Sequence, residues 1–189
     1  MNKTDHNKFA NAVLYLLKGC KQPPGLTKLL KMLYNADFRH YRKHLRSITH
    51  APYVALPRGP APDKYEDALD ALERGGIIAR MSVAIVGLDK LMTEFQAKKA
   101  PNMCVFDDTE IEVLDEILNE CAHKTGVALS EASHLEGPWS WAWNAESPGQ
   151  PVPYVLGRWL ENRCDDDDMS VARRALERAE VAEQLSRLS

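Results

Sequence analysis

A carboxylate placed on the apolar face of a helix is the feature that most constrains this chain. After residue 26, large apolar side chains recur at helical spacing, at Leu29, Leu30, Leu33, Tyr34, Tyr41 and Leu45. Asp37 lies three residues after Tyr34 and four before Tyr41, so it shares their face. A buried carboxylate is costly unless it accepts hydrogen bonds. We predict that Asp37 accepts them from the proline-rich segment that follows and holds residues 53–60 in place; a general-base role is the alternative.

A second run, residues 133–139 (SHLEGPW), places a histidine and a tryptophan on either side of a Gly-Pro pair. This pair predicts a sharp turn that ends a short helix begun near Ser130. We expect His134 and Trp139 to meet across the turn, with the histidine donating a hydrogen bond to a carbonyl beneath the ring. Tryptophans alternate here, at Trp139, Trp141 and Trp143. We expect one or two of them to be exposed and to serve as interface anchors.

Helical periodicity recurs along most of the chain. Caps and apolar stripes predict helices at residues 4–19, 27–45, 63–74, 107–121, 130–136, 151–162 and 170–188. β-Branched residues favour a short hairpin at 77–86, residues 88–97 also fit a helix, and residues 47–62 indicate an ordered extended loop. We predict a mainly α fold, a compact multi-helix domain with one small β-hairpin and an additional C-terminal helix. The domain spans residues 1–162, and an acidic linker with a helix follows at residues 163–189.

The composition is that of a soluble globular protein. Of the 189 residues, 44% are hydrophobic and 27% charged, and the formal net charge of −3 gives no overall attraction to nucleic acid. No window is apolar enough for a membrane span, and the N-terminus has no signal-peptide stretch. The four cysteines show no paired spacing, which is typical of free thiols in a reducing compartment. We expect a cytoplasmic protein that binds no membrane and needs no cofactor.

Charge gathers in two places. A basic run follows Asp37, at Arg39, His40, Arg42, Lys43, His44 and Arg46, and four carboxylates stand together at Asp165, Asp166, Asp167 and Asp168. A solvated helix face is the first interpretation of the basic run, an acidic partner the second and nucleic acid the third. His40 and His44 with Asp37 fit a metal site, but no zincin-type glutamate stands between the histidines. The sequence shows neither a nucleophile arrangement nor a phosphate-binding glycine loop, so we do not expect an enzyme.

At these runs the sequence resembles the SocA-like antitoxin family, also called the Panacea domain. The family's pattern Lys-Leu-x-Lys-Leu-Leu-Tyr-x-Ala-Asp, with a following His-Tyr, is similar to residues 28–37, His40 and Tyr41. Its Tyr-Val-Ala and Gly-Pro-Val-Pro segments are similar to residues 53–55 and 59–62, and its Ser-His-x-Glu-Gly-Pro-Trp to residues 133–139. The resemblance covers residues 6–162. Arg58 replaces a residue that is often aromatic or neutral, and Ala61 replaces the usual valine.

The resemblance implies an antitoxin, which is a cytosolic protein encoded beside a toxin and neutralising it by binding. We expect a structural role within the motifs for six residues: Asp37, Tyr53, Gly59, Pro60, His134 and Trp139. Candidate partner-binding residues are Arg39, His40, Arg42, Lys43, Arg58, Trp141, Trp143, Asp165, Asp166, Asp167 and Asp168. The toxin stays unnamed, because the domain accompanies many unrelated toxins.

We predict that the chain neutralises a cognate toxin by direct contact. Residues 163–189 are a candidate for specificity; they either fold on the toxin or dock back on the domain, and the aspartates mimic phosphates if the toxin binds nucleic acid. One alternative is a proteolytic adaptor that delivers the toxin to a AAA+ protease, which is similar to what one relative does. The others are a DNA-binding autoregulator and a metal-dependent hydrolase that uses Asp37, His40 and His44.

Overall fold

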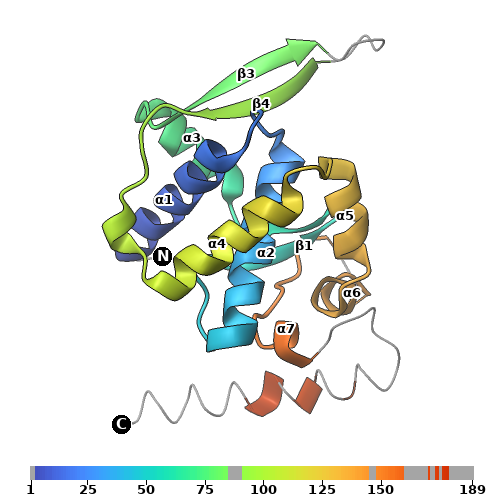
Figure 1. Cartoon of the computed structure of the whole chain (residues 1–189). Helices are drawn as coiled ribbons and strands as arrows, with labels where there is room; N and C mark the ends of the chain where they lie inside the picture. Colours follow the sequence, from blue (N-terminus) through green and yellow to red (C-terminus); the bar gives the residue numbers. More distant parts are fainter. Residues whose placement is uncertain are drawn as a thin grey trace.

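The computed structural model describes residues 3–84, 91–144, 148–159, 170, 173–174 and 176–178. Within these residues the chain forms seven α-helices, one 3₁₀ helix and two two-stranded antiparallel sheets (Figure 1). The helices are α1 (Lys3–Gly19), α2 (Leu26–His44), α3 (Tyr65–Arg74), η1 (Met103–Val105), α4 (Asp108–Cys121), α5 (Gly126–His134), α6 (Gly137–Asn144) and α7 (Leu156–Trp159). The strands are β1 (Tyr53–Leu56), paired with β2 (Gly59–Pro62), and β3 (Ile78–Ala84), paired with β4 (Leu91–Ala97).

The expectation of a mainly α fold with one hairpin was wrong. The fold is mixed α/β, with two hairpins among the described residues. The hairpin that the sequence concealed is β1–β2, which lies in the expected loop and begins with the pair Tyr53–Pro62. Pro60 and Pro62 have no N–H and argue against a strand inside a sheet. They are tolerated because β2 is an edge strand, whereas β1 is hydrogen-bonded on its other side to residues 149–152.

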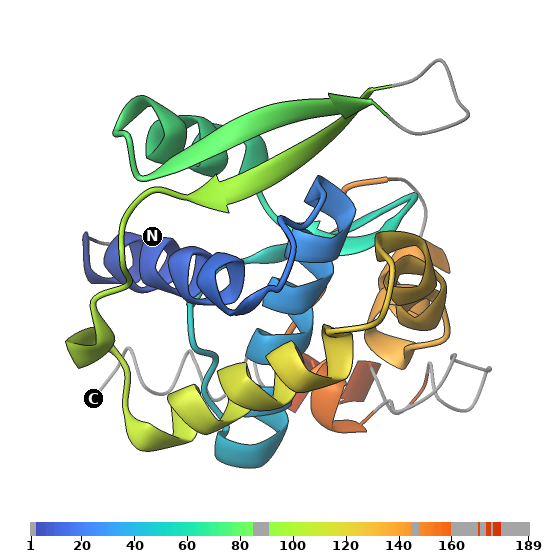
Figure 2. The same ribbon diagram turned by 45° about the horizontal axis from the view of Figure 1, so that its top comes forward.

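The second hairpin, β3–β4, has strands of seven residues each. Residues 91–97 are strand, so the helical alternative for this stretch was wrong. The base of the hairpin is buried through Ile78 and Phe95, whereas Val83 and Leu91 near its far end are exposed. The N–H of Phe95 donates to the carbonyl of Pro24 at 3.0 Å, which fastens β4 to the turn before α2. Figures 1 and 2 show the hairpin lying beside α3 and above α1, with its far end projecting from the helical body.

Helix α2 is the centre of the fold. Helices α1, α4, α5 and α7 and strands β2 and β4 contact it, and ten of its nineteen residues are buried. Its apolar side chains share one core with those of α1 and α4, including Leu16, Leu29, Leu33, Tyr34, Leu114 and Ile117. Burying a large apolar side chain of this kind stabilises a fold by about 1.5–3 kcal/mol. Because neighbours cover α2 on several sides, polar residues on it are buried as well, among them Lys31, Asp37 and His40.

Several helix boundaries differ from those expected. Helix α5 begins at Gly126, with Thr125 as its N-cap, and not at Ser130, and α7 begins at Leu156 and not at Pro151. Helix α3 has Lys64 as its N-cap in place of Asp63, without a side-chain cap hydrogen bond. Helix α2 begins at Leu26 with Gly25 as its N-cap, so Thr27, the expected cap, lies inside the first turn. Gly137 and Pro138, expected only to end a helix, begin α6. Proline suits this place because an N–H in the first helical turn has no helical carbonyl to bind.

The C-terminal region is described only in part. The boundary at residue 162, the aspartates at residues 165–168 and most of the helix expected at 170–188 lie outside the described residues. Residues 170, 173–174 and 176–178 are helical, and the half-buried Leu176 packs against Leu156 of α7. In the described part of the chain, no helix combines the length and the apolar character that crossing a membrane requires.

Candidate functional site

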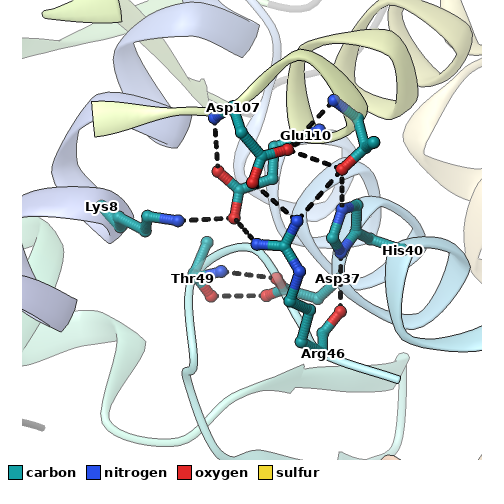
Figure 3. Close-up of polar contacts among 8 residues, drawn as sticks. Lys8, Asp37, His40, Arg46, Thr49, Asp107 and Glu110 are labelled. Atoms are coloured by element: carbon teal, nitrogen blue, oxygen red, sulfur yellow. Dashed lines mark hydrogen bonds and ion pairs between the residues drawn. The ribbon is translucent and has the colours of Figure 1, made fainter. Parts of the chain in front are cut away.

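Asp37 is fully buried and accepts three hydrogen bonds from one short segment. Its Oδ1 accepts from the backbone N–H of Thr49 at 2.7 Å. Its Oδ2 accepts from the hydroxyl of Thr49 at 2.5 Å and from the phenol of Tyr53 at 2.9 Å. Burial raises the pKa of Asp37, and these hydrogen bonds oppose the rise. The carboxylate thus ties the middle of α2 to the chain that enters β1, and the backbone N–H that it binds belongs to Thr49 rather than to residues 53–60 (Figure 3).

His40, one helical turn later, is also buried and has a partner at each ring nitrogen. Nδ1 lies 2.6 Å from the carbonyl oxygen of Arg46, and Nε2 lies 3.0 Å from the hydroxyl of Thr109 on α4 (Figure 3). Burial lowers the pKa of His40, which favours the neutral ring. The ring of His44 lies against it, with centroids 4.6 Å apart. Among the described residues, no three His, Cys, Asp or Glu side chains form a cluster suited to a metal ion.

A network of charges joins the start of α4 to α1 and to the end of α2 (Figure 3). Asp107 caps α4 through a capping box with Glu110, and Arg46 binds Asp107 at 2.6 Å. The buried Glu110 binds Lys8 of α1 at 2.5 Å. Burial acts to raise the pKa of Asp107, but hydrogen bonds from Thr109 and Arg46 prevail and hold it below its ordinary value. These contacts fix how three helices pack, so they serve the architecture of the domain.

Most of the basic run on α2 is paired within the chain. Both terminal nitrogens of Arg39 bind Glu120, at 2.5 and 2.8 Å. Lys43 binds Glu116 at 2.6 Å, and Nε of Arg42 donates to the carbonyl of Gly157 at 2.8 Å. The candidate partner-binding residues of α2 therefore contact α4 and α7.

The two sequence runs meet at the turn between β1 and β2. Nζ of Lys31, which is 2% exposed, donates to the carbonyl of Pro60 at 2.5 Å. The hydroxyl of Ser130 on α5 donates to the carbonyl of Arg58 at 2.8 Å. Gly59 lies between them at φ +89°, and a Cβ at this position would come within 2.2 Å of Oγ of Ser133 and 2.8 Å of Nζ of Lys31. A side chain at this position would have to displace Ser133 and Lys31 and adopt a strained positive φ, so glycine suits this close approach of α2, α5 and the hairpin.

Lys31 and Glu136 are site residues that the sequence reasoning missed. Burial lowers the pKa of Lys31 to about 7 and raises that of Glu136. The charge of each side chain opposes the shift of the other. A signal for Lys31 was present, because it lies three residues before Tyr34 and shares the face that singled out Asp37. Glu136 lies between two helices, where no helical spacing marks a residue as buried.

Three rings form a stack that joins α5 and α6 to the first hairpin. The rings of His134 and Trp139 have centroids 4.3 Å apart and an interplanar angle of 26°, and Trp139 stacks on Trp143 at 5.4 Å. Nε1 of Trp139 donates to the carbonyl of Leu56 at 3.0 Å. Trp139 is buried, whereas Trp141 and Trp143 are half-buried. The stack holds α6 against β1.

A cavity of about 290 Å³ opens beside this junction. Its wall consists of the first turns of α2, the β1–β2 turn and the start of α3, with Leu26, Thr27, Leu30, Lys31, Leu56, Pro57, Arg58, Gly59, Ala61 and Tyr65. A second cavity of about 360 Å³ shares Leu26 and Tyr65 with it and continues towards Arg80 and Phe95 of the second hairpin. The two cavities are therefore neighbours along one side of the fold.

Comparison with known protein families assigns the chain to one of them. The family model described as antitoxin SocA-like, Panacea domain, matches residues 29–140, more than half of the chain. The chain belongs to this family. No curated protein and no solved structure shows significant similarity to the chain. The Panacea-domain match includes the Asp37 contacts, the β1–β2 turn and Trp139, and it places the chain among antitoxin-like proteins of toxin–antitoxin systems.

Proposed function

We propose that the chain is an antitoxin that neutralises the protein toxin of a neighbouring gene by direct protein–protein contact. Its membership of the Panacea-domain family is the observation that carries this proposal. The geometry supports a binding role, because the polar motif residues serve internal contacts. Asp37 accepts three hydrogen bonds, and His40 has a partner at both ring nitrogens. Such groups position a surface and are not poised to transfer a proton.

Within the domain, the contacts favour a binding surface at the β1–β2 turn and α6 over one on the basic run of α2. Arg39, Arg42 and Lys43 are engaged with α4 and α7. Arg58 is exposed and, among the described residues, its side chain has no ion-pair partner. Exposed arginines and half-buried aromatic rings are the residue types that anchor protein interfaces. Arg58, Trp141 and Trp143 are therefore the members of the candidate set that we place at the toxin interface.

Growth of cells that express the neighbouring gene tests the proposed function. We expect arrest when this gene is induced alone and growth when the full-length chain is induced with it. A neighbouring gene with an early stop codon is the control and should be harmless in both strains. A toxic product that the soluble chain fails to neutralise would contradict the proposal. Rescue that disappears when the host's AAA+ proteases are deleted would replace direct neutralisation by delivery to a protease.

A further inference from the structure

The cavity beside the β1–β2 turn combines N–H donors, from Lys31 and the cationic Arg58, with apolar walls. Lys31 lies in its wall with one N–H engaged by Pro60, and Arg58 stands exposed at the turn. Among the described residues that line this cavity there is no aspartate or glutamate; the charge of Glu136 nevertheless acts on Lys31. Burial lowers the pKa of Lys31 to about 7, and Glu136 faces its remaining charge. The lasting positive charge at the cavity is therefore the guanidinium of Arg58, which has five N–H donors, while the Lys31 amine supplies a further N–H. A carboxylate is the protein group that matches such donors.

The start of α2 adds to this positive field. Leu26 and Thr27, the first two residues of α2, line the cavity. The N-cap is Gly25, which has no side chain to accept from the free N–H groups, and the first turn contains no acidic residue. The positive end of the helix dipole is therefore uncompensated by side chains of its own helix.

The remaining wall is apolar and limits what fits. Leu30, Leu56, Pro57 and Ala61 contribute it, together with the ring of Tyr65. Cavities that hold small-molecule ligands usually measure about 300–1,000 Å³. At about 290 Å³ this cavity is suited to one or two inserted side chains, an anionic one near Lys31 and Arg58 and an apolar one against the leucines.

We infer that this cavity receives an aspartate or glutamate of the toxin together with an adjacent apolar side chain. The inference rests on the proposed function and names the surface that would perform it. The second cavity, which shares Leu26 and Tyr65, gives the toxin segment a path towards β4. There Arg80 is paired with Asp70 at 2.5 Å and Glu66 is also present, so the charge is mixed. The acidic residue of the toxin therefore lies at the β1–β2 end.

Charge reversal at Arg58 tests the inference in the full-length chain. The experiment measures the Kd of the purified product of the neighbouring gene for wild-type chain, Arg58→Glu and Lys99→Glu. Lys99 is exposed and lies outside both cavities, so it controls for the change in net charge. We expect Arg58→Glu to weaken binding by about 10- to 100-fold, because it sets a carboxylate against the carboxylate of the toxin. Lys99→Glu should bind as the wild type does, and circular dichroism should show both variants folded.

A second arm identifies the toxin residue. Each aspartate and glutamate of the toxin is changed to arginine and combined with Arg58→Glu. One of these changes should restore binding to Arg58→Glu while weakening binding to the wild type. Equal affinity of Arg58→Glu and wild type would overturn the inference and leave the antitoxin function standing. Failure of the wild-type chain to bind the product at all would instead remove the proposed function itself.

Discussion

Single residues on α2 show how burial turns a polar side chain into a structural element. Asp37 satisfies its lone pairs with Thr49 and Tyr53, and Lys31 donates to Pro60. Each of these side chains lies on the apolar face and has a partner from the chain around the first hairpin. The cost of burying a charge is thus offset by hydrogen bonds that hold the hairpin on the helix.

Removing the Asp37 carboxylate should destabilise the protein strongly. Asp37→Ala leaves three buried donors without an acceptor, and each costs about 1–3 kcal/mol. We expect a loss of at least about 3 kcal/mol in the free energy of unfolding in urea. Tyr53→Phe removes one of the three hydrogen bonds and should cost only about 1 kcal/mol. Equal losses for the two variants would show that the carboxylate does not carry this network.

Lys31 should make stability depend on pH. Burial lowers its pKa from 10.5 to about 7. Between these values the unfolded chain holds a proton that the folded chain lacks, so this residue makes the folded state more stable as the pH rises. Lys31→Met has no such titration. We expect the free energy of unfolding of the wild type, relative to the variant, to rise by up to about 1.4 kcal/mol per pH unit above pH 7. Urea unfolding of both proteins at several pH values measures this difference. If the two free energies of unfolding change with pH in the same way, the pKa of Lys31 is not lowered.

At the scale of elements, the β1–β2 hairpin is the piece that joins the two sequence runs. Its turn lies under Lys31 of α2 and Ser130 of α5, and its first strand receives the Trp139 indole. Gly59 makes this packing possible because it combines a positive φ with an absent Cβ. The packing around the turn is therefore sensitive to a single methyl group.

Two glycines with similar positive φ values allow the effect of the backbone conformation to be measured apart from the effect of the added Cβ. Gly59→Ala places a Cβ against Ser133 and Lys31, whereas Gly149, at φ +94°, has no atom within 4 Å of the added carbon. Gly149→Ala should lose only the conformational cost of about 1–2 kcal/mol. Gly59→Ala should lose about 1–3 kcal/mol more through the clash. Thermal and urea unfolding of both variants measure the difference, and equal losses would show that the turn relaxes freely.

For the whole molecule, we propose that residues 1–162 form the folded domain and that residues 163–189 add to it. The Panacea-domain match ends at residue 140, and Leu176 packs on Leu156 of α7. A chain ending at residue 162 should stay folded, and among the described residues it loses the apolar contact of Leu176 with Leu156. We expect Tm to fall by about 2–4 °C for each 1 kcal/mol lost, as read by calorimetry. An insoluble or non-cooperative product would show that the tail belongs to the domain.

Local pattern predicted the helices better than the hairpins. The stripe on residues 27–45 and the Asp107 cap correspond to α2 and α4. The prolines of β2 concealed a strand, because a strand that tolerates missing N–H groups is recognised only when its place at a sheet edge is known. The fold class was wrong for this reason. The spacing that singled out Asp37 also applied to Lys31, and that residue could have been predicted.

The sequence by itself determined the family, most of the helices and the unusual position of Asp37, since these depend on residue types at short spacing. Only the tertiary structure decided that α2, the β1–β2 turn and α5 meet at Gly59 and leave a cavity beside it that Lys31 and Arg58 line. It also decided that most of the basic run is paired with α4 and α7. These contacts join residues that lie far apart in the chain, and no local pattern encodes which distant groups share the space between packed elements.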